Sequence, residues 1–134
     1  MALRNWFRRT NLPLTGAPAV RRLKTYSAQT GYVYQYRYEG QRPFRAGGDD
    51  GVEFVFSVSA SRRGAVSVAI RVSGAALRAW EEGHSRQLSS TERYAVAKMA
   101  LFQAFDERPT PARMADEVNV RHADLQAILD ALGV

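Results

Sequence analysis

The feature that most constrains the fold is a change of hydrophobic period near residue 72. Before it, residues 24–38, 52–60 and 65–72 alternate apolar and polar side chains with a period of two. Such alternation is typical of strands that bury one face. After it, apolar residues recur three and four positions apart, as on one side of a helix. We therefore expect an α+β chain, with a three-stranded antiparallel sheet covered on one face by helices.

The segments between the expected strands predict how the strands connect. Residues 40–51 are polar and rich in glycine, which favours a long loop, whereas residues 61–64 form a short turn with a glycine. The second and third strands should then pair as a hairpin, with sheet order 1-2-3. Four tyrosines of the first strand share the face that matches the apolar faces of the other two strands, which places them in the core: Tyr32, Tyr34, Tyr36 and Tyr38.

Capping residues predict two helices after the sheet. Ser73 can cap a helix over residues 75–83, and Ser89 with Glu92 forms the capping-box pattern that opens a helix over residues 90–106. The longer helix is apolar nearly all round, so we expect it to be central. Prolines and arginines make residues 1–23 a basic irregular arm. Residues 24–134 are expected to be one domain, with sheet in 24–72 and helices in 73–134.

The C-terminal segment predicts a helical pair. Thr110 followed by proline starts a short helix ending near Val118, Asn119 and Val120 form a turn, and a second helix covers residues 122–132. With the preceding long helix, residues 90–133 resemble the helix-turn-helix family. The resemblance implies a DNA reader with base-facing and phosphate-facing side chains at Arg121, His122, Gln126 and Arg113.

The charge distribution favours a different surface. Net charge is +6; residues 1–72 hold twelve basic and four acidic side chains, net +8, whereas residues 73–134 hold seven basic and nine acidic, net −2. A basic half attracts phosphate groups without any motif. The outer sheet face, with Arg37 and Arg71, is therefore a second candidate for nucleic-acid or anion binding. A solvated sheet face and an Arg-rich composition without function predict the same pattern.

Several classes of function find no support in the sequence. The absence of cysteine excludes disulfides and thiolate chemistry, and His84 and His122, the only histidines, fall in different predicted helices. No phosphate loop or nucleophile motif occurs, so we expect neither an enzyme nor a cofactor. No apolar run approaches the length of a transmembrane segment, and the cytoplasm is the expected location.

The sequence thus predicts a small non-enzymatic binding protein, with nucleic acid as the leading ligand. The alternative is a protein-interaction or assembly module with no nucleic-acid role. The oligomeric state stays open.

Overall fold

The computed structural model describes residues 12–60 and 64–134. Its elements are, in chain order, β1 (Lys24–Ser27), β2 (Val33–Ala46), β3 (Asp49–Ala60), β4 (Val66–Ser73), α2 (Gly74–His84), α3 (Ser90–Glu107), the 3-10 helix η1 (Pro111–Ala115), β5 (Val118–Val120) and α4 (His122–Leu132). The strands form one sheet in the order β1-β2-β3-β4-β5, antiparallel except for the parallel pair β4 and β5. The α+β class is confirmed, but the sheet has five strands where three were predicted.

The first predicted strand is in fact a hairpin. Residues 28–32 turn back between β1 and β2, closed by hydrogen bonds from Ala28 N–H to the Tyr32 carbonyl and from Gly31 N–H to the Ala28 carbonyl. Gly31 has a φ of 95°, a conformation that other residues rarely adopt. The period-two pattern continues on both sides of this turn, so the pattern alone does not reveal where the chain reverses.

The predicted loop over residues 40–51 is also wrong, because it is the end of a second hairpin. β2 continues to Ala46 and β3 begins at Asp49, and Gly47 and Gly48 between them both have positive φ, as the tight turns of hairpins require. A register shift between Tyr38 and Gly40 interrupts the pairing of β2 with β3. The shift explains why alternation fades after Tyr38, since a bulge moves later side chains to the opposite face.

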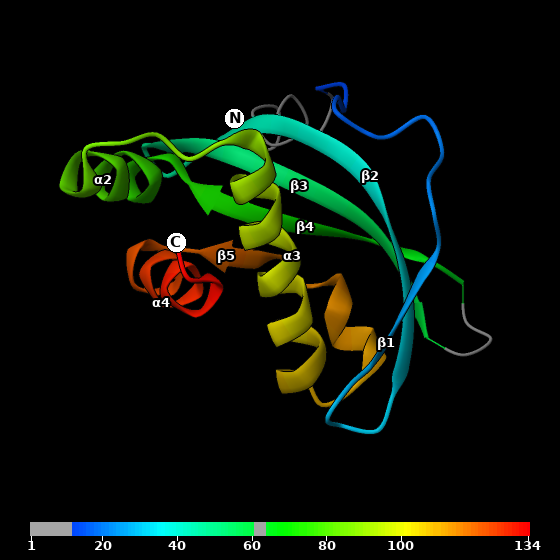
Figure 1. Cartoon of the computed structure of the whole chain (residues 1–134). Coiled ribbons are helices and arrows are strands. Elements are labelled where there is room, and N and C mark those ends of the chain that lie inside the picture. The colour runs from blue at the N-terminus through cyan, green and yellow to red at the C-terminus, as the bar shows by residue number, and fades with distance from the viewer. Residues whose placement is uncertain (1–11, 61–63) are drawn as a thin grey trace.

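The core lies between the concave face of the sheet and α3, which crosses that face, while α2 and α4 lie beside it (Figure 1). The capping box of α3 is formed: Ser89 Oγ accepts from the Glu92 N–H, and Glu92 accepts from the Ser89 N–H. Tyr34 and Tyr36 are buried and Tyr38 is partly buried, as predicted, whereas Tyr32 in the turn is 38% exposed. None of the described helices is long and apolar enough to cross a membrane.

The C-terminal segment does not form the predicted helix-turn-helix pair. Its first helix is the short η1, and the residues expected to turn, Asn119 and Val120, belong to β5, which pairs with β4. The Arg108 guanidinium stabilises this path by donating hydrogen bonds to the carbonyls of Arg113, Asp116 and Glu117 at 2.7, 2.6 and 3.1 Å. The predicted helical half of the chain therefore also supplies a strand to the sheet.

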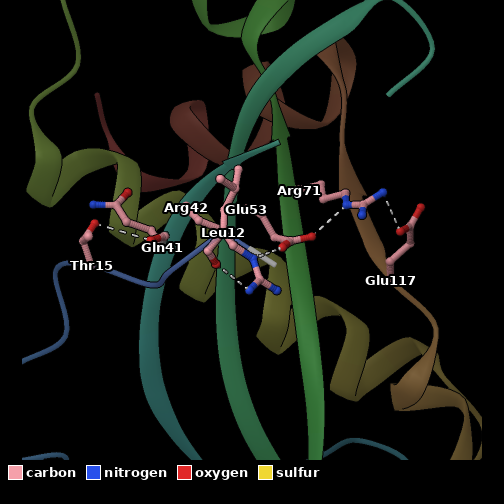
Figure 2. A network of polar contacts seen from close by, with 7 residues as sticks. All are labelled: Leu12, Thr15, Gln41, Arg42, Glu53, Arg71 and Glu117. Carbon is pink, nitrogen blue, oxygen red and sulfur yellow. Dashed lines mark hydrogen bonds and ion pairs between the residues drawn. The ribbon is translucent and has the colours of Figure 1, made fainter. Parts of the chain in front are cut away.

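A buried ion-pair network joins the strands on the convex face (Figure 2). Glu53 of β3 is only 4% exposed, and its carboxylate accepts from Arg42 Nε at 2.7 Å and from Arg71 Nε at 2.9 Å. Arg71 also contacts Glu117 before β5 at 2.8 Å and lies over the Phe44 ring. One carboxylate thus links β2, β3 and β4, and Arg71 extends the link toward β5.

The described part of the predicted arm is fixed to the sheet. Thr15 and Gln41 of β2 exchange two backbone hydrogen bonds of 2.8 Å. The Thr15 hydroxyl also donates to the Gln41 carbonyl at 3.4 Å, and Arg42 donates to the Leu12 carbonyl at 3.2 Å (Figure 2). The start of the predicted arm, residues 1–11, and most of the predicted 61–64 turn lie outside the described residues.

Candidate anion-binding site

A hollow opens where the N-terminal segment separates from the edge of β2. Thr15 pairs with Gln41 and Lys24 pairs with Tyr36, so eight residues, 16 to 23, span the distance covered by four residues, 37 to 40, on β2. The extra length forces this segment to bow away from the strand. The resulting space of about 420 Å³, which we call the basic hollow, is lined by Gly16, Pro18, Val20, Arg21, Arg22, Lys24, Tyr36, Arg37, Tyr38 and Tyr94.

Positive charge dominates the rim of the basic hollow. Arg21 and Arg37 share the carboxylate of Glu39, with N–O distances of 3.1 and 2.9 Å. Arg22 and Lys24 are exposed, and no carboxylate in the described part of the chain forms an ion pair with either. The hollow therefore keeps net positive charge after its internal pairs are counted, which favours a negatively charged ligand.

Tyrosines form the floor of the basic hollow. The Tyr38 and Tyr94 rings meet edge to face with centroids 4.9 Å apart, and Tyr36 is 4% exposed. Burial and the nearby Tyr94 raise the pKa of Tyr36, and the same two causes raise the pKa of Tyr38 to about 12. Burial also raises the pKa of Tyr94. These hydroxyls consequently stay protonated at neutral pH and can donate hydrogen bonds to an anion.

A second lysine belongs to this region although it is not in the lining. Lys98 lies one helical turn after Tyr94 on α3, is half-buried, and approaches Lys24 of β1. Burial is the main cause that lowers the pKa of Lys98. Contact with the positively charged side chain of Lys24 lowers it further. Two neighbouring ammonium groups repel each other, and an anion bound beside both would reduce that repulsion.

The two predicted residues of the outer sheet face lie apart and have different partners. Arg37 lines the basic hollow, and its side chain is 48% exposed. Arg71 is 17% exposed and held between Glu53 and Glu117, so its charge is already compensated. Arg37 pairs with Ser57 of β3, and Ser57 pairs with Ser67 of β4. Ser67 is four residues before Arg71 on β4. That offset amounts to roughly 13 Å along the strand.

The predicted groove-reading residues lie at the other end of the chain. Arg113 in η1 is 64% exposed and pairs with Asp116 at 3.1 Å. Arg121 and His122 are exposed at the start of α4, while Gln126 is half-buried and donates to Asp130 at 2.9 Å. Arg121 lines a separate hollow of about 340 Å³ together with Arg71 and the acidic Asp49 and Glu117. The structure thus brings Arg71 and Arg121 together, in surroundings that include two carboxylates.

Sequence reasoning found part of the basic hollow and missed the rest. It named Arg37 as a candidate, and it counted Arg22 and Lys24 only within the net charge of the basic first half. Tyr94 and Lys98 were assigned to a central helix without a site role. Their spacing of four residues places them on one side of α3, but only the tertiary fold shows that this side meets β1 and β2.

The described residues give no sign of metal chemistry, since no group of three or more His, Asp or Glu side chains gathers in them. The fold and the basic hollow define a mixed α+β protein in which a curled sheet surrounds one long helix and a bowed segment encloses a tyrosine-floored space. No protein-family model, no curated protein and no solved structure matches this chain.

Proposed function

We propose that this chain is a non-enzymatic binding protein whose ligand is a nucleic-acid strand, held at the basic hollow. The observation that carries the proposal is the cationic rim around a hollow whose lining contains no acidic side chain among the described residues. The negative charge of a nucleic acid lies on its phosphate groups. When cationic side chains bind these phosphates, the counterions bound to the nucleic acid are released, and this release favours binding. The ligand is expected to be single-stranded, because a recess at a sheet edge accepts a flexible chain more readily than a rigid duplex.

The C-terminal helix is the weaker candidate for nucleic-acid binding. Residues 110–134 hold two basic and four acidic side chains, a net charge of −2. Contacts to phosphate normally supply much of the affinity of DNA-binding proteins. The turn that should orient α4 as a recognition helix is replaced by β5. A contribution from Arg113, Arg121, His122 or Gln126 is therefore a secondary hypothesis.

A salt series with a single-stranded oligonucleotide tests the proposal. We expect affinity to fall as salt rises, with a slope of roughly −0.7 for each phosphate contacted. Replacing Arg22 and Lys24 together by alanine should weaken binding and reduce the slope by about 1.4, because two contacts are lost. Arg78→Ala on α2, whose side chain is 61% exposed, is the matched control for loss of a surface arginine and should leave binding unchanged.

Two results would count against the proposal. If the affinity does not change with salt, or if the oligonucleotide does not bind even at low salt, the chain does not hold a strand through its phosphate groups. Loss of binding in Arg121→Ala and Gln126→Ala variants, with no effect of the Arg22 and Lys24 changes, would move the site to α4.

A protein partner is the second candidate function, and one observation favours it. Val20 and Leu23, in the segment that encloses the basic hollow, are 71% and 59% exposed. Large exposed aliphatic side chains near one another are a common feature of protein contacts. The partner to test is a second copy of this chain. If the oligonucleotide does not bind and the chain self-associates, replacing Val20 and Leu23 by serine should reduce the self-association measured by sedimentation.

A further inference from the structure

The tyrosines of the basic hollow offer hydroxyl groups more readily than ring faces. The Tyr38 ring lies 5.3 Å from Phe56 and 4.9 Å from Tyr94, and the Tyr36 ring lies 5.6 Å from Phe102, measured between centroids. Rings packed in this way have little free face on which a base could stack. No described group forms a hydrogen bond with the hydroxyls of Tyr36, Tyr38 or Tyr94. The floor therefore supplies unused hydrogen-bond donors.

The lysine pair beside the floor favours an anion with more than one charge. Lys24 and Lys98 approach each other, and Lys98 also lies with its ammonium 5.7 Å from the centroid of the Phe102 ring. A phosphodiester in the middle of a strand carries one negative charge. A terminal phosphate monoester carries between one and two at neutral pH and presents three free oxygens to donors. Two ammonium groups and several hydroxyls match the terminal group better.

The position of the basic hollow also favours the end of a strand. It is bounded by the β2 edge, by the bowed segment 16–23 and by α3, and this segment is fixed at both ends by its pairing with β2. A strand passing through must enter and leave past these walls, whereas a strand end needs only one opening. The arginines on the rim, Arg21 and Arg22, can then contact the next phosphates along the strand.

We propose that the basic hollow holds the terminal phosphate monoester of a nucleic-acid strand against Lys24 and the hydroxyls of Tyr38 and Tyr94, with Lys98, next to Lys24, adding a second positive charge. This inference rests on the proposed function and adds to it the part of the strand that is recognised. In this view the arginines of the rim attract any nucleic-acid strand by charge, and the floor of the hollow recognises the phosphate at the end of the strand.

The test compares one oligonucleotide sequence in three forms: with a 5′-phosphate, with a 3′-phosphate and with hydroxyl groups at both ends. Internal labelling leaves both ends free. We expect at least one phosphorylated form to bind about tenfold more tightly than the hydroxyl form, since charge-assisted hydrogen bonds are strong. Inorganic phosphate, added at matched ionic strength, should abolish this preference while the hydroxyl form stays bound.

Variants of the floor separate end recognition from general attraction. Lys98→Met and Tyr94→Phe should each reduce the preference to twofold or less, because they weaken binding of the phosphorylated form much more than binding of the hydroxyl form. Arg78→Ala is the control and should keep the full preference. The phosphorus NMR shift of the terminal phosphate in the complex gives a second readout, which should change on binding to the wild type and not on binding to Lys98→Met.

The outcomes distinguish the two proposals. If all three forms bind equally and with a salt slope, the inference about the strand end is overturned and the proposed function stands. If no form binds, both are overturned. If the preference persists in both floor variants, the terminal phosphate binds elsewhere and the assigned site is wrong.

Discussion

Glu53 is the residue on which the sheet's convex face depends. Its carboxylate is 4% exposed and accepts from Arg42 and Arg71, which lie on the neighbouring strands. Glu53→Gln removes the negative charge that Arg42 and Arg71 share at a nearly buried position, while Arg71 keeps its contact with Glu117. We expect the free energy of unfolding to fall by about 3 kcal/mol. The midpoint of thermal unfolding, followed by circular dichroism, should fall by roughly 10 °C.

The control for this change is an exposed ion pair of the same chain. Asp50 and Arg78 approach to 3.4 Å with side chains 56% and 61% exposed. Asp50→Asn should cost less than about 1 kcal/mol, because solvent screens such pairs. Equal effects of the two variants would show that the Glu53 network contributes nothing beyond a surface pair.

The charge of Lys98 makes a second prediction at the residue scale. Its pKa is lowered by burial and by Lys24, so the charged form costs the folded state stability at neutral pH. That cost disappears as pH rises through the lowered pKa toward the ordinary value of 10.5. Lys98→Met should therefore unfold at a higher temperature than the wild type at pH 7, and the two curves should converge at high pH.

Inorganic phosphate provides the check on this prediction. At pH 7 it should raise the unfolding temperature of the wild type by binding beside the two lysines, and have a smaller effect on Lys98→Met. The neighbouring Tyr38, with its pKa of about 12, stays neutral over most of this range. A difference between the two proteins that does not change with pH would mean that methionine stabilises by packing alone.

The sequence could predict which face of the sheet a side chain lies on, but not which residue it pairs with on the neighbouring strand. Alternation correctly put Glu53 on the face opposite Phe54 and Phe56, where a solvated carboxylate is the ordinary expectation. Burial follows from Arg42 and Arg71 standing level with it on both neighbouring strands. That alignment depends on the register shift after Tyr38, which no local pattern in the sequence encodes.

At the scale of elements, Arg108 decides the path of the chain between α3 and α4. Its guanidinium donates to three carbonyls in residues 113–117. Arg108→Ala should lower the free energy of unfolding by about 2 kcal/mol, since three hydrogen bonds from a charged donor are lost and only water can replace them. Hydrogen exchange should show the largest loss of protection at β5, Val118–Val120, with α3 less affected.

Arg113→Ala is the matched control, because it removes an arginine from the same segment without touching those hydrogen bonds. Its exposed pair with Asp116 should contribute less than about 1 kcal/mol. A uniform loss of protection across the sheet in Arg108→Ala would contradict a local role for this residue.

The helix-turn-helix prediction failed because the local pattern is compatible with two structures. Val118 and Val120 are apolar residues on either side of Asn119, which fits a turn between helices and equally fits a short strand. The deciding interaction is pairing with β4, about fifty residues earlier in the chain, and that information is not local. The capping signals, by contrast, are local, and the predicted starts at Ser73 and Ser89 are confirmed.

At the scale of the whole molecule, the basic hollow results from a mismatch in chain length between two neighbouring segments. The basic charge of residues 1–72 predicted an anion site in the first half of the chain, but α3 supplies Tyr94 and Lys98 from a segment that sequence analysis treated as core. The shape depends on two fixed points, Thr15 on Gln41 and Lys24 on Tyr36. Binding should therefore depend on a contact that carries no charge.

Gly40 tests that dependence. It has a φ of 128°, and a Cβ added there would lie 2.8 Å from the Thr15 carbonyl oxygen, so Gly40→Ala must displace the segment from β2. Gly31→Ala is the matched control, with a φ of 95° and open space around the added Cβ. Both variants should lose about 1–2 kcal/mol from backbone strain. Only Gly40→Ala should also weaken oligonucleotide binding and expose residues 16–23 to proteolysis. If both variants bind the oligonucleotide equally well, binding does not depend on the contact between Thr15 and β2.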